Sequence, residues 1–122
     1  MYTEALQLAG RIIMENGGET YRVEETITRM AAAMGMTEVE SFAVPSGVFF
    51  SYMTPSGQHE SVVTRVHRQG TDLTRVNAVN AVSRELEAGQ LTVEGALDKL
   101  KEIQHSPSQL PQWLLVILTG IS

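Results

Sequence analysis

Apolar residues recur along the chain at two spacings, and each change of spacing marks a change of secondary structure. From Thr3 to Asn16, and again from Thr20 to Met34, they return every three or four residues, which is typical of amphipathic helices. Gly17 and Gly18 follow the first run and Gly35 follows the second, and glycine readily adopts the left-handed conformation found at helix ends. These runs predict two helices, the second capped at its start by Thr20.

A region rich in β-branched and aromatic residues comes next. It predicts three short strands, at Glu38–Val44, Val48–Met53 and Glu60–Arg68, separated by turns at Pro45–Gly47 and Thr54–Gly57. Connections this short favour an antiparallel sheet. The middle run carries apolar side chains on both faces, so we expect it to be the central strand.

The helical spacing then returns twice. It predicts helices at about Leu73–Ala88, capped by Asp72, and about Val93–Gln104, capped by Thr92. The predicted fold class is therefore α+β: two helices, a small three-stranded antiparallel sheet and two further helices, all within residues 1–105. After these elements we expect the start of an apolar C-terminal helix.

The end of the chain has the most unusual pattern. Residues 106–112 contain two prolines and predict a linker, and residues 113–122 contain no charged side chain. This apolar segment is about half the length that a membrane-spanning helix needs, and it opens with Trp113, a residue type favoured at membrane interfaces. A core helix, an interfacial anchor and the start of a transmembrane helix all fit the pattern.

Composition narrows the class of protein. The 122 residues carry a net charge of −5 and include no cysteine, which fits one globular domain without disulfides or thiolate metal ligands. The acidic balance argues against general nucleic-acid binding. Residues 61–84 are the exception, because this stretch contains a single acid and four arginines, Arg65, Arg68, Arg75 and Arg84. These arginines form either ion pairs with neighbouring elements or a surface for anions or lipids.

Patterns that indicate catalysis or metal binding are weak in this sequence. His59, His67 and His105 are far apart, and none is four residues from another His or from a paired acid, so we expect no metal site. Ser46 and Ser56 lie in Pro-Ser-Gly turns, where a hydroxyl supports the turn. We therefore expect no enzymatic activity.

The densest polar cluster lies at the start of the second predicted helix. Glu19, Arg22, Glu24 and Glu25 fall within one short stretch after the glycine pair. Arg22 is three residues from both Glu19 and Glu25, so it can approach either carboxylate on a helix. One interpretation is an ion-paired helix start, and the other is a polar surface at a glycine hinge that contacts a solute or another domain.

At this cluster the sequence resembles the N-terminal domain of the threonine/serine exporter family. The resemblance covers about residues 4 to 118, and the ordered set of motifs carries it rather than any single piece. The motifs are Gly10, Gly17-Gly18-Glu19-Thr20-Tyr21-Arg22-Val23-Glu24-Glu25-Thr26, Val44-Pro45-Ser46-Gly47-Val48-Phe49, Thr64-Arg65-Val66, Gly70-Thr71-Asp72-Leu73, Glu85-Leu86-Glu87-Ala88-Gly89-Gln90-Leu91-Thr92 and Ala96-Leu97-Asp98-Lys99-Leu100.

The resemblance implies a cytoplasmic domain, at the inner face of the cell membrane, that precedes a transmembrane bundle exporting small amino acids or related small carboxylates. It implies that residues 113–122 begin the first membrane helix, that Trp113–Ile121 contact the membrane, and that no cofactor is needed. The expected partners are the transmembrane portion, in the same or a partner protein, the small solute and further subunits of an oligomer. A small hydrolase-like enzyme and a soluble ligand-binding module remain the alternatives.

We expect the polar cluster to serve that role through particular residues. Glu19, Arg22, Glu24 and Glu25 would form a gating or docking surface, or contact the solute. Arg65 and Arg68 would supply counter-charge, or would simply pair with those acids.

Overall fold

The chain folds into two helices, three strands and two further helices. The computed structural model describes residues 1–68 and 70–106, and it confirms the predicted α+β class and element order. The elements are α1 (Tyr2–Glu15), α2 (Thr20–Ala33), β1 (Thr37–Val44), β2 (Gly47–Met53), β3 (His59–Arg65), α3 (Leu73–Glu87) and α4 (Val93–His105).

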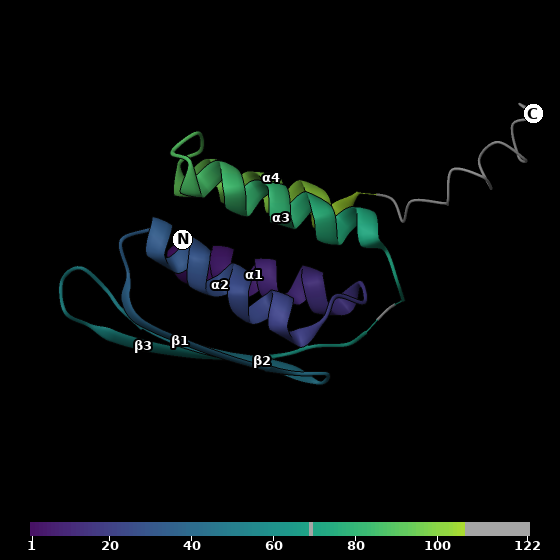
Figure 1. The fold of residues 1–122 in the computed structure, drawn as a ribbon, viewed down its shortest axis with the longest axis horizontal. Helices are drawn as coiled ribbons and strands as arrows, with labels where there is room; N and C mark the ends of the chain where they lie inside the picture. The colour runs from purple at the N-terminus through teal and green to yellow at the C-terminus, as the bar shows by residue number, and fades with distance from the viewer. Residues whose placement is uncertain (69, 107–122) are drawn as a thin grey trace, which may run out of the picture.

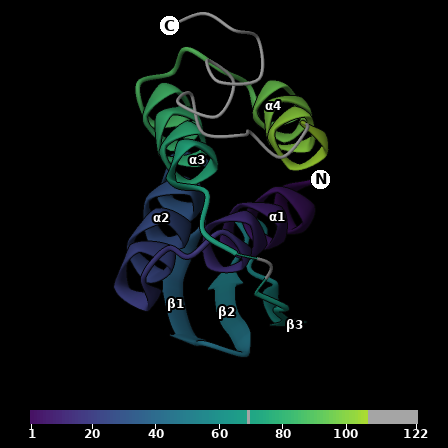
Figure 2. The same cartoon turned by 90° about the vertical axis from the view of Figure 1, so that its right-hand side faces the viewer.

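The elements stack in three layers (Figure 1). The sheet is the first layer, α1 and α2 form the middle layer, and α3 and α4 form the outer layer. In the middle layer, α2 packs on β1 and α1 contacts β3, while both helices also contact the outer pair (Figure 2). The apolar faces of α1 and α2 are therefore covered from two sides, which explains why so many of their residues are buried.

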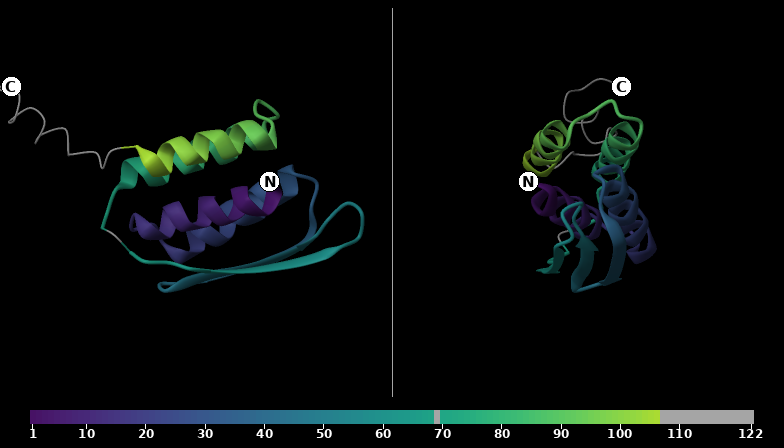
Figure 3. Two further views of the ribbon diagram at one scale, coloured as in Figure 1. Left: turned by 180° about the vertical axis from the view of Figure 1, so that it is seen from behind. Right: turned by 90° about the vertical axis from the view of Figure 1, so that its left-hand side faces the viewer.

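The sheet is antiparallel with the order β1-β2-β3, which confirms the predicted central strand. Val48, Phe50 and Tyr52 of β2 point toward the helices and are buried. The opposite face of the sheet is not covered by any described element, as the views from both sides show (Figure 3). The sheet is thus buried on one face only.

The hydrophobic core lies between the sheet and the outer helices. Its largest fully buried side chains come from every layer, so the four helices and the sheet share one core. These side chains are Tyr52, Phe50, Leu6, Ile12, Ile13, Ile27, Met30, Leu100, Val23 and Val79.

The predicted ends of the elements agree closely with the structure, with two corrections. Asp72 and Thr92 cap α3 and α4 as expected, accepting hydrogen bonds from the backbone N–H groups of Arg75 and Gly95. Thr20 is the first residue of α2 rather than its cap, since Glu19 takes that position without a side-chain cap bond. The third strand ends at Arg65 rather than Arg68, because the chain then leaves the sheet toward α3.

The predicted linker and membrane segment lie almost wholly outside the described residues. The fourth helix ends at His105, and Ser106 is extended, while residues 107–122 are not described. Within the described part of the chain, no helix combines the length and hydropathy that crossing a membrane requires. The division into a domain, a linker at 106–112 and a membrane segment at 113–122 stays a prediction.

Candidate functional site

The α1–α2 turn, formed by Asn16, Gly17 and Gly18, organises the candidate site. Gly17 has a φ of +87°, a conformation that favours glycine. The backbone N–H of Gly18 donates to the carbonyl of Ile13 at 2.8 Å, and the Asn16 side chain donates to the carbonyl of Ile12 at 2.7 Å. The turn therefore closes the end of α1 tightly and sets the direction of α2.

A hollow of about 210 Å³ lies beside this turn, and we call it the glycine-turn pocket. It brings Glu19 and Arg22 together, as the sequence predicted. Arg68 approaches the same turn from the β3–α3 connection, with its guanidinium 3.4 Å from the position of a Cβ on Gly17. The pocket is lined by Gly17, Gly18, Glu19, Tyr21 and Arg22, and by Leu73, Val76 and Asn77 of α3.

The remaining acids of the cluster lie elsewhere and have structural partners. The Glu24 carboxylate accepts the backbone N–H of Ala43 at 2.9 Å, and the Glu24 carbonyl accepts the hydroxyl of Ser41. Glu24 thus satisfies an otherwise free donor on the edge strand β1. Glu25 pairs with Arg29, with 3.1 Å between Oε1 and Nη2, so the expected pairing of Glu25 with Arg22 is wrong.

Arg65 is not part of this site. It lies at the end of β3, opposite Gly47 of β2, whereas Glu24 lies at the other edge of the sheet. Among the described residues, neither Arg65 nor Arg68 forms an ion pair with Glu19, Glu24 or Glu25. The structure therefore places Glu19 and Arg22 on one pocket, with Arg68 beside Gly17 of the same turn, and leaves the other three predicted residues apart from them.

A chain of contacts that the sequence did not predict joins this turn to the end of α4. The Asp72 backbone N–H donates to the carbonyl of Asn16 at 3.0 Å. The Asp72 carboxylate lies 3.5 Å from Nε of Arg75, and the other end of that guanidinium donates to the carbonyl of Ser106. Helical spacing shows the Asp72–Arg75 pair, but nothing in the sequence indicates the reach to Ser106, 31 residues from Arg75.

This chain of contacts gives a testable prediction for Arg75. Arg75→Ala should lower the free energy of unfolding by about 1.5–3 kcal/mol, because it removes the hydrogen bond from the guanidinium to the Ser106 carbonyl and leaves the largely buried Asp72 carboxylate without its ion-pair partner. Denaturant unfolding followed by circular dichroism measures this. The matched control is Arg84→Ala, at an exposed position on the same helix. Equal effects of the two substitutions would contradict this role for Arg75.

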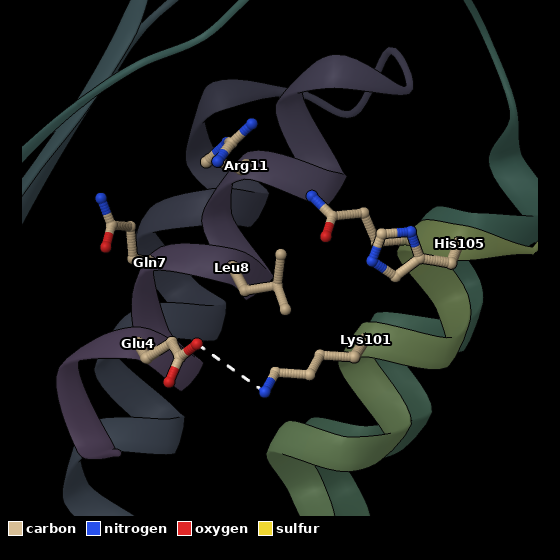
Figure 4. A pocket seen from close by; sticks show the side chains of 7 residues that line it. Glu4, Gln7, Leu8, Arg11, Lys101 and His105 are labelled. Atoms are coloured by element: carbon tan, nitrogen blue, oxygen red, sulfur yellow. Dashed lines mark ion pairs between the residues drawn. The ribbon is translucent and has the colours of Figure 1, made fainter.

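A second polar hollow, of about 280 Å³, lies between α1 and α4 (Figure 4). Glu4 of α1 and Lys101 of α4 pair across it at 3.8 Å, Leu8 lies in its middle, and Arg11 and His105 lie at its other end. Both partners of the ion pair are about half exposed, so the pair adds little stability. Its contribution is to align the end of α4 against α1.

A third polar group joins α1 to the sheet. The hydroxyl of buried Tyr52 donates to the Glu60 carboxylate at 2.5 Å, and the Thr3 hydroxyl donates to the same oxygen at 3.0 Å. Burial and the contact with Glu60 raise the pKa of Tyr52 above its usual 10.0. The hydrogen bonds from Tyr52 and then Thr3 hold the pKa of Glu60 below its usual 4.5.

The lowered pKa of Glu60 predicts a pH dependence. The stabilisation is complete above the usual glutamate pKa of 4.5, which applies to the unfolded state, and is lost as the pH falls through the lower pKa of the folded state. Glu60→Gln should therefore be less stable than the unsubstituted chain at neutral pH, and the gap should shrink on acidification. Thermal melts at a series of pH values from neutral to acidic test this dependence, with Glu102→Gln, at an exposed position of α4, as control. A gap that does not change with pH would contradict the prediction.

The glycine-turn pocket can hold opposite charges close together. The Glu19 carboxylate can accept hydrogen bonds from an ammonium group or a basic side chain, and the Arg22 guanidinium can donate to a carboxylate. The first N–H groups of α2 add partial positive charge at the same place. Within residues 1–68 and 70–106, no three His, Asp or Glu side chains are grouped to hold a metal ion.

The sequence matches a family of transporters. The model of the family described as "Putative threonine/serine exporter" matches residues 4–122, so the chain belongs to this family. It is similar to "Probable succinate transporter subunit YjjP" of Escherichia coli (strain K12), with 26% identity over 113 residues, which are 93% of this chain and 43% of that protein. The Klebsiella aerogenes protein of the same name is 27% identical over 110 residues, which are 90% of this chain and 42% of that protein.

The chain spans about two fifths of the length of these relatives. No solved structure matches it. The match of the family model confirms the resemblance to the threonine/serine exporter family.

Proposed function

We propose that residues 1–105 form a cytoplasmic domain of a membrane exporter of small amino acids or small carboxylates, and that this domain supports assembly or gating of the transporter. The observation that carries the proposal is the family match, which runs through the folded domain and through the charge-free segment at 113–122. In this proposal that segment starts a membrane helix, and the domain lies at the inner face of the membrane.

The geometry supports a docking role for one end of the molecule. The glycine turn, the start of α3 and the end of α4 all lie at the same end, in views from the front and from behind (Figures 1 and 3). The contacts from Asn16 through Asp72 and Arg75 to Ser106 bind these three places together. These contacts would therefore transmit a change in the direction of the chain after Ser106 to the glycine-turn pocket.

We propose that Glu19 and Arg22 contact the membrane portion of the transporter, with Arg68 as counter-charge. The relatives are named as subunits, which supports a partner chain as one source of that membrane portion. In this assignment Glu24 and Glu25 stabilise the domain, Arg65 serves another surface, and the domain has no enzymatic role. Solute selection and ion coupling belong to the membrane portion.

Export from cells tests the proposal. The complete reading frame that contains this chain is expressed in cells that lack their own exporter, and release of radiolabelled threonine, serine or succinate is measured. Glu19→Ala and Arg22→Ala should slow export while the amount of protein in the membrane stays the same. Glu87→Ala and Arg84→Ala, at the far end of α3, are the matched controls.

Equal export by all four variants would contradict the proposed docking role of the glycine-turn pocket. Absence of solute release from the complete protein, with the protein present in the membrane, would overturn the exporter assignment for these solutes.

A further inference from the structure

The uncovered face of the sheet carries a row of apolar side chains. Phe42, Phe49 and Val63 lie opposite one another on the three strands, and their exposed fractions are 61%, 37% and 76%. All four helices lie on the other side of the sheet (Figures 1 and 3). Contiguous exposed apolar side chains mark candidate surfaces for a protein partner or a membrane.

The residues on either side of this row differ in charge and size. Toward one end of the strands, Glu40, Ser51 and Ser61 lie side by side, and toward the other end Val44, Gly47 and Arg65 do. The acid and the base therefore occupy diagonally opposite corners of one face. Among the described residues, neither Glu40 nor Arg65 has an ion-pair partner.

The same face also carries a hollow. It measures about 520 Å³ and is lined by Gly47, Val63, Arg65 and His67, together with Ser46 and neighbouring backbone. Gly47 has no side chain to fill it, and a Cβ there would lie 3.2 Å from the carbonyl of Thr64. An exposed phenyl ring, that of Phe42, and a space without a side chain thus lie on one surface.

We propose that this face binds the same face of a second copy of the chain. A two-fold axis along the diagonal through Val44, Phe49 and Ser61 sets the two sheets face to face with their strands crossing at about 70°, nearer to the orthogonal than to the aligned arrangement of packed sheets. This axis places Phe42 over the partner copy's Gly47 hollow and Val63 over its Ser51. Phe42 and Val63 then face small residues, and Phe49, which lies on the axis, meets Phe49 of the second copy.

The same axis brings the opposite charges together. Glu40 of each copy faces Arg65 of the other, and because a two-fold interface is isologous, the pair forms twice. The unlike charges at opposite corners are what a self-complementary surface requires. An anionic lipid surface fits this face less well, since Glu38 and Glu40 line one of its edges and would be repelled.

This dimer goes beyond the proposed function and does not depend on it. The sheet and the α3–α4 pair are the two outer layers of the molecule (Figure 1). A second copy on the sheet therefore leaves Ser106 and the glycine-turn pocket free.

Charge reversal tests the proposal directly. Sedimentation velocity measures the self-association of the 122-residue chain in a mild detergent, which solvates the apolar segment at 113–122. Arg65→Glu and Glu40→Arg should each weaken the dimer by about tenfold or more, because each places two pairs of like charges in contact. The double variant should restore it. Arg84→Glu and Glu87→Arg, on α3 in the far layer, should leave it unchanged.

The absence of cysteine from the sequence allows a second test. Val44→Cys places one thiol of each copy on the proposed axis, and a bifunctional thiol-reactive crosslinker of about 10 Å, the spacing of packed sheets, should join them. Ala81→Cys, at an exposed position of α3, should not be crosslinked in this way. A monomeric chain, association unaffected by reversal at position 40 or 65, or failure of the double variant to restore it would each overturn the proposal. So would vesicle binding by a monomer that Phe42→Asp abolishes, since the face would then serve a membrane.

Discussion

Phe50→Ala is expected to lower the free energy of unfolding by about 3–5 kcal/mol. Phe50 lies on the central strand with none of its surface exposed, and its ring lies parallel to that of Tyr52, with 6.2 Å between the ring centroids. The substitution removes a large apolar side chain between the sheet and the middle helices. It leaves a cavity that the surrounding side chains fill only in part, so the loss exceeds the transfer free energy alone.

The neighbouring residue supplies the control. Phe49 lies on the opposite face of the same strand and is 37% exposed. Phe49→Ala should therefore change the free energy of unfolding of the monomer by less than about 1 kcal/mol. Urea unfolding of both variants, at protein concentrations where the chain is monomeric, gives the comparison. Equal losses would mean that the sheet is buried on both faces within one chain, contrary to the architecture described above.

Gly18→Ala is expected to lower the free energy of unfolding by about 1–3 kcal/mol. A Cβ at Gly18 would lie 2.3 Å from Cγ2 of Ile13 and 2.8 Å from its carbonyl oxygen. Ile13 is itself fully buried, and its carbonyl accepts the Gly18 N–H. The carbonyl cannot move away without breaking the end of α1, and Cγ2 can move only by displacing the core around Ile13, so the turn would have to open.

Gly95→Ala is the matched control for this substitution. Gly95 lies in the first turn of α4, and the nearest atom to a Cβ there is Oγ1 of Thr92 at 3.3 Å. Alanine has the higher helix propensity, so this variant should be neutral or more stable. A Gly18→Ala variant as stable as the unsubstituted chain would show that the α1–α2 turn is not held as described, and Arg22 would lose its fixed position with it.

The sequence predicted the elements because local rules determine them. Helical spacing located all four helices, and side-chain caps located the starts of α3 and α4 at Asp72 and Thr92. The cap of α2 was misplaced because Thr20 is a common capping residue type, whereas Glu19 takes the position without using its side chain. The apolar run of β2 identified the central strand, but it could not show that the face with Phe49 would lack a covering layer in this chain.

The candidate site was predictable only where its residues share one turn of helix. Glu19 and Arg22 are three residues apart on α2, so the sequence could place them together. Glu25 has Arg22 three residues before it and Arg29 four residues after it in the sequence. An acid one turn before a base on a helix is the more favourable order, which favours the pair with Arg29. The contact of Glu24 with an edge strand depends on how layers pack, which a single sequence does not reveal.

Protease accessibility shows on which side of the membrane the domain lies. A protease site is placed in the exposed β2–β3 turn at Gly57, where no atom crowds the chain, within the complete reading frame. A cytoplasmic domain joined to a membrane portion should sediment with membranes, be cleaved in inverted vesicles and be protected in intact spheroplasts. Cleavage from outside intact spheroplasts, or a domain that stays in the soluble fraction, would contradict this placement.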